Sequence, residues 1–435
     1  MTFDQLVTLA VLIAVVAALI LDKGRADVIA LAGAAFLLVT GIVRPVEVQG
    51  AFASPAIIAL ASLFVIAYAM ELSGLLDSAI EKVVALCRRI GTAGLWVLIG
   101  LAGAASGFLN NTPIVVLSAP VVRDAAKSLG QSPKRYLIPL SYAAVLGGCC
   151  TLIGTSTNLL VNDMASVAGQ PRFGMFEITP VGLAVAIAGG LYLLAFSGRL
   201  VRSDDDPKAD TSAAEFARPE LVGGSIGSAE AFSKRVPLQP LRAIVSLSVF
   251  ILVVALAALN VAPIAACAFA GAVLLILMRI ITADEAYRGL RPEVLMLIAG
   301  MVVLGIALDE TGLASSASHA LIGTMRGMSP TLALVILYGV TVFSTEILSN
   351  ATVAVLFTPV AVSMADAFDV SPRPFLVAIM IAASAAFATP FGYQTNALVY
   401  QMGRYNYVDF IKIGLPLNLI TWAVGVTAIQ VYFPF

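Results

Sequence analysis

The sequence predicts an all-α polytopic membrane protein built from two inverted repeats of five transmembrane helices, each with a re-entrant hairpin and a broken helix. Composition, the length of the apolar runs and an internal duplication predict this class. The chain has 435 residues, of which 60% are hydrophobic and 12% are charged. Its mean hydropathy is +0.98. Soluble domains carry about 25% charged residues, so this composition indicates a chain surrounded by lipid.

Apolar runs of roughly 17–25 residues are long enough to cross a bilayer. Such runs cover residues 5–21, 27–43, 55–73, 177–197, 242–259, 261–281, 294–312 and 409–433. Longer stretches, interrupted by polar residues, cover 92–122, 136–168, 329–365 and 374–402. No cleavable signal peptide is apparent, so the first run is expected to be retained as a span. We therefore expect a multi-pass protein of the cell membrane (the inner or plasma membrane), embedded in the lipid bilayer.

A pair of polar motifs occurs twice, 238–239 residues apart. The first copy is Asn-Asn-Thr-Pro at 110–113 with Gly-Thr-Ser-Thr-Asn at 154–158, and the second is Ser-Asn-Ala-Thr at 349–352 with Gly-Tyr-Gln-Thr-Asn at 392–396. A constant offset over most of the chain indicates two homologous halves. In lipid, a backbone break survives only where protein buries it or where it lines a cavity. Paired breaks in corresponding halves therefore point to the binding site of a transporter.

The duplication predicts the domain organisation. The first repeat is expected to cover 1–198, with scaffold helices, a hairpin at 92–128 and a broken helix at 136–168. A cytoplasmic linker is expected at 199–241. The second repeat is expected to cover 242–435, with a hairpin at 329–368 and a broken helix at 373–402. If each hairpin returns to its own side, five spans per half remain, and an odd number inverts the second half. Of the 25 basic residues, 21 then fall on one side, which the positive-inside rule makes cytoplasmic.

The motifs also predict where half-helices begin. Thr112 followed by Pro113 is typical of a helix start, with a capping hydroxyl and proline at the first helical position. Ser349 and Asn350 offer the same capping chemistry. Helix N-termini that converge at membrane depth attract an anion, and unwound carbonyls beside them suit a small cation. No Lys or Arg lies near the motifs, so we expect co-bound cations to offset the charge of the anion.

The motifs resemble those of a known family. Asn-Asn-Thr and Ser-Asn-Ala resemble the paired Ser-Asn-Thr signatures of the divalent anion/sodium symporter family (solute carrier family 13-like, in the ion transporter superfamily). The resemblance implies an elevator-type transporter, usually a homodimer, with sodium ions for coupling and no other cofactor. It implies substrate contacts from Asn110, Asn111, Thr112, Thr155, Ser156, Ser349, Asn350, Gln394 and Thr395. It implies two sodium sites, one at Ser106, Asn111 and Gly154 and one at Thr345, Asn350 and Gly392.

The sequence departs from the family pattern in ways that bear on the substrate. Asn110 replaces the first Ser, Ala351 replaces the second Thr, and the tandem prolines after the glycine are missing from both halves. The lost hydroxyl at Ala351 favours a small oxyanion such as sulfate over a C4-dicarboxylate, and both classes stay open. The predicted function is sodium-coupled symport of a divalent anion.

The alternative function is a cation/proton antiporter or an arsenite-type exporter of the same superfamily. Either would favour titratable groups at the broken helices, where Glu346 is the nearest candidate. Glu346 could tune cation binding, carry a proton or form a structural hydrogen bond across the hairpin. An enzyme is not expected, because the chain has a single histidine and no His-Glu-x-x-His motif. No basic stripe exists, so nucleic acid is not expected as a partner. A passive anion channel would differ by failing to drive uphill uptake.

Overall fold

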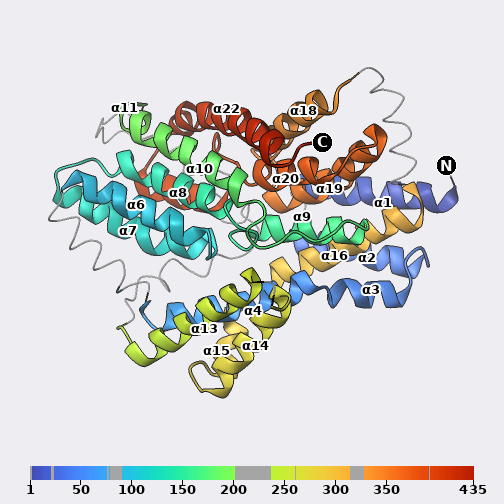
Figure 1. The fold of residues 1–435 in the computed structure, drawn as a ribbon, viewed down its shortest axis with the longest axis horizontal. Helices are drawn as coiled ribbons and strands as arrows, with labels where there is room; N and C mark the ends of the chain where they lie inside the picture. The colour runs from blue at the N-terminus through green and yellow to red at the C-terminus, as the bar shows by residue number, and fades with distance from the viewer. Residues whose placement is uncertain are drawn as a thin grey trace. The chain divides into compact units, whose positions relative to one another are not determined.

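The computed structural model describes the whole chain except residues 1, 21–23, 76–77, 79–90, 201–236, 260, 314–327 and 391. All regular elements within those described residues are helices (Figure 1). Most of the predicted linker, residues 201–236, lies outside the described part. The chain divides into two compact units, each assembled from three separate segments. Unit 1 comprises Met1–Ala79, Asn162–Met175 and Ala229–His319, and unit 2 comprises Ile80–Val161, Phe176–Ser228 and Ala320–Phe435.

Unit 1 pairs helices from the two halves of the sequence. It contains α1 (Phe3–Ile20), α2 (Ala26–Val39), α3 (Pro45–Phe52), α4 (Pro55–Leu72), α13 (Pro240–Ala258), α14 (Ile264–Leu277), α15 (Ala283–Gly289) and α16 (Pro292–Glu310). α2 packs along α16, and α4 packs along α14. A Cβ added at Gly300 would lie 2.8 Å from the backbone carbon of Ala30, so glycine allows the first of these helix pairs to approach closely.

Unit 2 contains the interrupted stretches of both halves, except for the end of the first one from Asn162 onward. Its helices are α6 (Thr92–Ser106), α7 (Asn111–Ser128), α8 (Lys134–Gly148), the start of α9 (Ser156–Val167), α10 (Thr179–Tyr192), the π-helix η1 (Leu193–Ser197), α11 (Gly198–Leu200), α18 (Pro330–Ser344), α19 (Asn350–Phe368), α20 (Arg373–Ala382), α21 (Gln394–Gly403) and α22 (Tyr407–Tyr432). α8 packs against α6, α7, α10 and α21, and α20 packs against α18, α19 and α22 (Figure 1). Every residue of α20 from Pro374 onward is buried. These two helices form the centre of unit 2, and each is followed by an unwound segment.

The helix order of the first half recurs in the second half. α6 begins at Thr92 and α18 at Pro330, a spacing of 238 residues, while α7 begins at Asn111 and α19 at Asn350, a spacing of 239. Helix bounds agree with the predicted apolar runs to within a few residues. The short helices α3 and α15 were not predicted. Each starts with a capping box in which Glu47 or Glu285 is the third helical residue. This signal is local, and both helices are too short to be recognised as long apolar runs.

Five helical stretches are long and apolar enough to cross a membrane by length and composition: Pro45–Leu72, Thr179–Ser197, Pro240–Ala258, Asn350–Phe368 and Tyr407–Tyr432. A sixth candidate is Ala283–Gly289 joined to Pro292–Leu308, with a bend of 60° between them. Several of the other helices, α2 and α6 among them, are apolar but shorter. The chain is therefore a multi-pass membrane protein, and the predicted number of ten complete spans stays a prediction.

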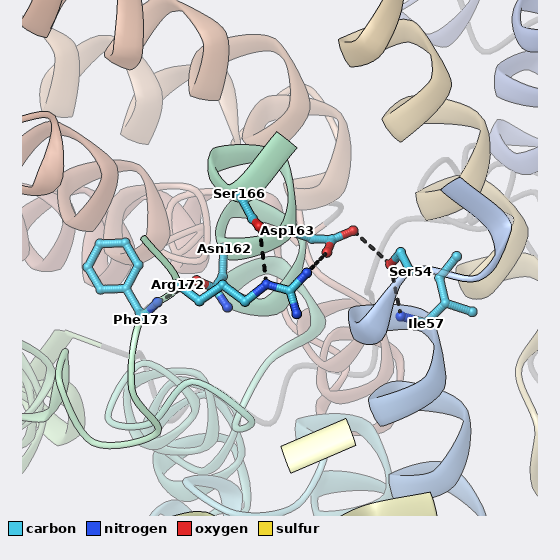
Figure 2. A network of polar contacts seen from close by, with 7 residues as sticks. All are labelled: Ser54, Ile57, Asn162, Asp163, Ser166, Arg172 and Phe173. Atoms are coloured by element: carbon cyan, nitrogen blue, oxygen red, sulfur yellow. Dashed lines mark hydrogen bonds and ion pairs between the residues drawn. The ribbon is translucent and has the colours of Figure 1, made fainter. Parts of the chain in front are cut away.

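The end of α9 is held within unit 1 by a buried carboxylate. Asp163, which is 3% exposed, accepts a hydrogen bond from the Ser54 hydroxyl at 2.8 Å, and the Arg172 guanidinium lies 3.6 Å from its other oxygen (Figure 2). The side-chain Oδ1 of Asn162 accepts from the N–H of Phe173 at 2.7 Å. These contacts tie α9 and the loop after it to the start of α4. Asp163 thus has both a donor and a positive partner in a buried position, as a buried carboxylate requires.

Candidate functional site

The first-half site lies where the α6–α7 turn meets the unwound segment between α8 and α9. The Ser106 hydroxyl donates to Oδ1 of Asn111, and both residues are buried. A Cβ added at Gly148 would lie 2.7 Å from that same Oδ1. The Asn111 side chain therefore packs directly on the backbone at the end of α8, which only glycine permits. This arrangement brings together two of the three residues predicted for the first sodium site.

A threonine not predicted from the motifs organises the unwound segment 149–155. The Thr151 hydroxyl donates to the carbonyl of Gly107 and accepts from the N–H of Gly154 at 3.1 Å. Asn158 Nδ2 donates to the Thr151 carbonyl at 2.9 Å. A Cβ at Gly154 would lie 2.5 Å from the carbonyl oxygen of Gly148, which explains the glycine of the motif. The hydroxyl and the amide replace the helical hydrogen bonds that the break removes.

The second-half site repeats this arrangement with equivalent residues. The Thr345 hydroxyl lies 2.8 Å from Oδ1 of Asn350 and 2.7 Å from the carbonyl of Ala383. The Thr389 hydroxyl donates to the carbonyl of Glu346 at 3.0 Å and accepts from the N–H of Gly392 at 3.1 Å. Asn396 Nδ2 donates to the carbonyl of Ala386 at 2.8 Å. Thr151 and Thr389 are 238 residues apart, so the duplication itself is the sequence signal that could have identified them.

The helix starts at the two hairpin tips confirm one predicted cap and correct the other. Ser349 caps α19, because its hydroxyl accepts from the N–H of Thr352 at 3.2 Å. The prediction of Thr112 as the cap of α7 was wrong. The cap is Asn110, whose side-chain oxygen accepts from the N–H of Thr112 at 3.2 Å. Pro113 is therefore the third helical residue and not the first. Because Pro113 has no N–H at the third helical position, the Asn110 side chain accepts from the N–H of Thr112, the second helical residue.

Polar side chains from the two halves also meet within unit 2. Asn111 Nδ2 donates to the Tyr393 hydroxyl at 2.8 Å, and the Thr112 hydroxyl donates to Oε1 of Gln394 at 3.3 Å. The Ser141 hydroxyl lies 2.7 Å from both Thr395 Oγ1 and Asn396 Oδ1. Sequence reasoning missed Tyr393 and Ser141, because the tyrosine has no counterpart of its own type in the first half and the serine lies outside the motifs.

Burial divides the predicted residues into two groups. The residues predicted for sodium are all deeply buried except Gly392, which is half-buried. Among those predicted for the anion, Ser349 is exposed, and the half-buried ones are Asn110, Thr112, Ser156 and Gln394. Thr155 and Thr395 are buried, and the Thr155 hydroxyl accepts from the N–H of Thr157 at 3.4 Å. Ser156 and Asn350 are placed at helix starts beside these groups, at the first residues of α9 and α19.

The chemistry of the site is that of neutral oxygens and N–H groups. Its side chains are hydroxyls and amides, apart from Glu346 in the turn between α18 and α19. Within the described part of the chain, no three His, Cys, Asp or Glu side chains gather closely enough to hold a metal ion. Hydroxyl, amide and carbonyl oxygens are ligands for hard cations, whereas transition metals prefer imidazole and thiolate. The N-termini of α7 and α19 add N–H groups suited to an anion.

Comparison with known proteins identifies the family. The family model described as "Citrate transporter" matches residues 16–372 and 329–435. The chain belongs to the citrate transporter family. Family membership makes this protein a membrane transporter, so it is not an enzyme. It also confirms the resemblance to the divalent anion/sodium symporters.

Relatives agree with this assignment. An uncharacterized transporter of Synechocystis, sll0640, is 24% identical, with 95% of this chain and 94% of that protein aligned. The sodium-dependent dicarboxylate transporter SdcS of Staphylococcus saprophyticus is 24% identical over 90% of this chain and 79% of its own length. Sodium/sulfate cotransporter 1 of Chlamydomonas reinhardtii is 34% identical, over 35% of this chain and 18% of its own length. These names support a secondary transporter of anions.

A solved structure supports the fold. The crystal structure of the YdaH transporter of Alcanivorax borkumensis superposes with a TM-score of 0.53, covering 89% of this chain and 86% of that chain. The sequences are only 16% identical, so the similarity concerns the fold alone. The helical architecture described above is therefore one that a membrane transporter adopts.

Proposed function

We propose that this citrate-transporter-family protein couples inward sodium flow to the uptake of a divalent anion. The anion is a sulfate-like oxyanion or a C4-dicarboxylate. The observation that carries the proposal is the duplicated hydroxyl–amide pair, Ser106 with Asn111 and Thr345 with Asn350. Each pair places a buried oxygen beside an unwound segment and at the first residue of a helix, Asn111 of α7 or Asn350 of α19. Oxygen for a cation and N–H groups for an anion then occur in the same unit, as coupled binding requires.

The cation sites follow from the two hydroxyl–amide pairs. We assign one sodium ion to Ser106, Asn111 and the backbone at Gly154, and a second to Thr345, Asn350 and the backbone at Gly392. The polar residues around the two helix starts and the unwound segments then contact the anion: Asn110, Asn111, Thr112, Thr155, Ser156, Ser349, Asn350, Gln394 and Thr395. Because no basic side chain lies at these motifs, a divalent anion would be costly to desolvate alone. Two bound sodium ions offset its charge and make the binding of anion and cation interdependent.

The architecture suggests how the anion crosses the membrane. We propose that residues 1–198 and 242–435 are inverted repeats joined by the linker at 199–241. Unit 2, with both hairpins, the second broken helix and the first as far as Val161, is then the transport domain that carries the anion. Unit 1 is then the scaffold through which two copies form a homodimer. All four polar motifs belong to unit 2, which supports an elevator mechanism over a gated pore.

Uptake into proteoliposomes tests the proposal. Labelled sulfate and labelled succinate are offered to vesicles with an inward sodium gradient, and then to vesicles with an inward potassium gradient. We expect one of the two anions to accumulate above its equilibrium concentration with sodium only. Excess unlabelled thiosulfate, phosphate or citrate then defines the substrate class by competition.

The same vesicles discriminate between the proposal and its rivals. Downhill flux without accumulation would indicate a passive channel. Cation flux driven by a proton gradient, with no anion uptake, would indicate an antiporter. Either result would contradict the proposed symport.

A further inference from the structure

The second hairpin of unit 2 contains a buried carboxylate with an uneven set of partners. Glu346 is 8% exposed and lies in the turn between α18 and α19. Its Oε1 accepts three hydrogen bonds, from the N–H groups of Phe387 and Ala388 at 2.8 Å and from Asn418 Nδ2 at 2.6 Å. Its Oε2 is buried and has no hydrogen-bond partner, and neither has Oδ1 of Asn418. One oxygen of the carboxylate is therefore saturated, while the other is left unpaired.

These two unpaired oxygens cannot satisfy each other, because both are acceptors. A buried acceptor without a partner costs free energy, and a buried negative charge without a positive partner costs more. None of the described Lys or Arg side chains forms an ion pair with Glu346. Asp163, the other deeply buried carboxylate described above, has Arg172 within 3.6 Å. The Glu346 site therefore calls for a positive ligand that the described side chains do not supply.

The first half shows that a broken helix does not itself need such a carboxylate. At the equivalent spacing of 239 residues, Gly107 occupies the position of Glu346. The N–H groups equivalent to those of Phe387 and Ala388 belong to Cys149 and Cys150, which donate to the carbonyls of Val145 and Gly147. α8 therefore continues to Gly148, whereas α20 ends at Ala382. The charge at Glu346 is present only in the second half.

We propose that Glu346 Oε2 and Asn418 Oδ1 belong to a third binding site for a monovalent cation of the sodium class. This site is separate from the two duplicated ones. The inference rests on the proposed function, because the cation is a further coupling ion. Carboxylate and amide oxygens are hard ligands that suit such an ion. The three positive charges of three sodium ions would balance the two negative charges of a divalent anion and the one of the Glu346 carboxylate. Only the sodium ions and the anion are released inside the cell, because the carboxylate stays with the protein. Each cycle therefore moves one net positive charge inward.

Dependence of uptake on membrane potential tests the third site. Proteoliposomes with equal sodium gradients are given zero or inside-negative potential through a potassium gradient and valinomycin. We expect the negative potential to accelerate anion uptake by the wild type and to have no effect on Glu346→Gln. In this variant the amide oxygen can still accept from the N–H groups of Phe387 and Ala388 and from Asn418 Nδ2. The substitution therefore keeps the contacts of Oε1 while it removes the charge.

Two further variants keep the test decisive. Asn418→Leu removes one ligand and retains the volume, and we expect the sodium concentration for half-maximal uptake to rise about tenfold or more, equivalent to one hydrogen bond to a charged group. Glu310→Gln removes a carboxylate that is 51% exposed in unit 1 and should leave the potential dependence unchanged. Equal stimulation of the wild type and Glu346→Gln, with normal sodium dependence in Asn418→Leu, would overturn the third site. A potential response that follows the proton gradient instead of sodium would also overturn it. Sodium-independent uptake by the wild type would instead refute the proposed function.

Discussion

The two halves of unit 2 share one set of contacts and differ in another. Both contain a hydroxyl–amide pair below a helix start, a threonine that bridges the hairpin to the unwound segment, and an asparagine that bonds the unwound carbonyls. They differ where Gly107 corresponds to Glu346 and where Thr155 corresponds to Tyr393. The shared contacts create the same oxygen-lined break twice. The differing residues give the second half a negative charge and a hydroxyl that reaches the first half.

The largest expected effect concerns the shared amides. Asn111→Ala and Asn350→Ala each remove a buried oxygen assigned to sodium, and we expect each to reduce sodium-driven uptake to background. A hydrogen bond or ligand to a charged group is worth about 1.5–3 kcal/mol, which corresponds to about 10- to 150-fold in affinity. Thr427→Ala is the control, because that exposed hydroxyl bonds only the carbonyl of Ala423 on its own helix. Wild-type sodium affinity in both Asn variants would refute the site assignment.

The next effect concerns the stability of the two breaks. Asn158→Ala and Asn396→Ala each leave buried unwound carbonyls without a donor, which costs about 1–3 kcal/mol. Asn396→Ala is expected to cost more, because its Oδ1 also lies 2.7 Å from the Ser141 hydroxyl, whereas Asn158 Oδ1 has no partner. Thermal unfolding of the purified variants in detergent measures the difference. If Asn158→Ala proved the less stable of the two, the halves would not differ in the way the contacts indicate.

A smaller effect is expected at Tyr393, the residue that links the halves. Its hydroxyl accepts from Asn111 Nδ2 and so keeps Oδ1 turned toward Ser106. Tyr393→Phe should raise the sodium concentration for half-maximal uptake by about 2- to 12-fold, the equivalent of one neutral hydrogen bond. Tyr192→Phe, which loses a bond to the carbonyl of Ile413, serves as the control. An unchanged sodium requirement in Tyr393→Phe would show that Asn111 needs no support from the second half.

The smallest effect concerns selectivity at the second hairpin tip. Ala351 occupies the first turn of α19, where the family pattern has threonine. If the missing hydroxyl restricts the site to small oxyanions, the wild type prefers sulfate to succinate. Ala351→Thr then shifts the ratio toward succinate by about 2- to 12-fold, the worth of one neutral hydrogen bond. Ala351→Val has the shape of threonine without the hydroxyl and should not produce the shift. A wild type that already prefers succinate, with no change in Ala351→Thr, would exclude Ala351 as the determinant.

The sequence predicted the long helices of unit 1 well because each is a continuous apolar run. α13 at Pro240–Ala258 and α16 at Pro292–Glu310 begin within two residues of the predicted runs. The duplicated motifs also coincide with the helix starts at Asn111, Ser156, Asn350 and Gln394. The cap of α7 was mistaken because Asn110 and Thr112 are both good capping residues. The structure decides for Asn110, because its side-chain oxygen accepts from the N–H of Thr112.

The contacts that give the site its asymmetry could not be predicted. Asn418 lies 72 residues after Glu346, and Tyr393 lies 282 residues after Asn111. Neither Asn418 nor Tyr393 has a counterpart of its own type that would single it out in the sequence. Such pairs depend on how the helices of unit 2 pack against one another, and local sequence patterns do not predict that packing. The proposed site residues at the helix starts could be predicted from the duplication. The differences between the halves could be found only in the structure.

The most direct test of the account is whether sodium and the anion bind together. Purified full-length protein in detergent is mixed with labelled sulfate or labelled succinate, in sodium chloride and then in potassium chloride of equal ionic strength. The account predicts saturable binding of one anion in sodium chloride and none in potassium chloride. It also predicts that Asn111→Ala and Asn350→Ala both abolish this binding, while Thr427→Ala retains it. Equal binding in the two salts, or sodium-dependent binding that survives both Asn substitutions, would contradict the duplicated sodium site.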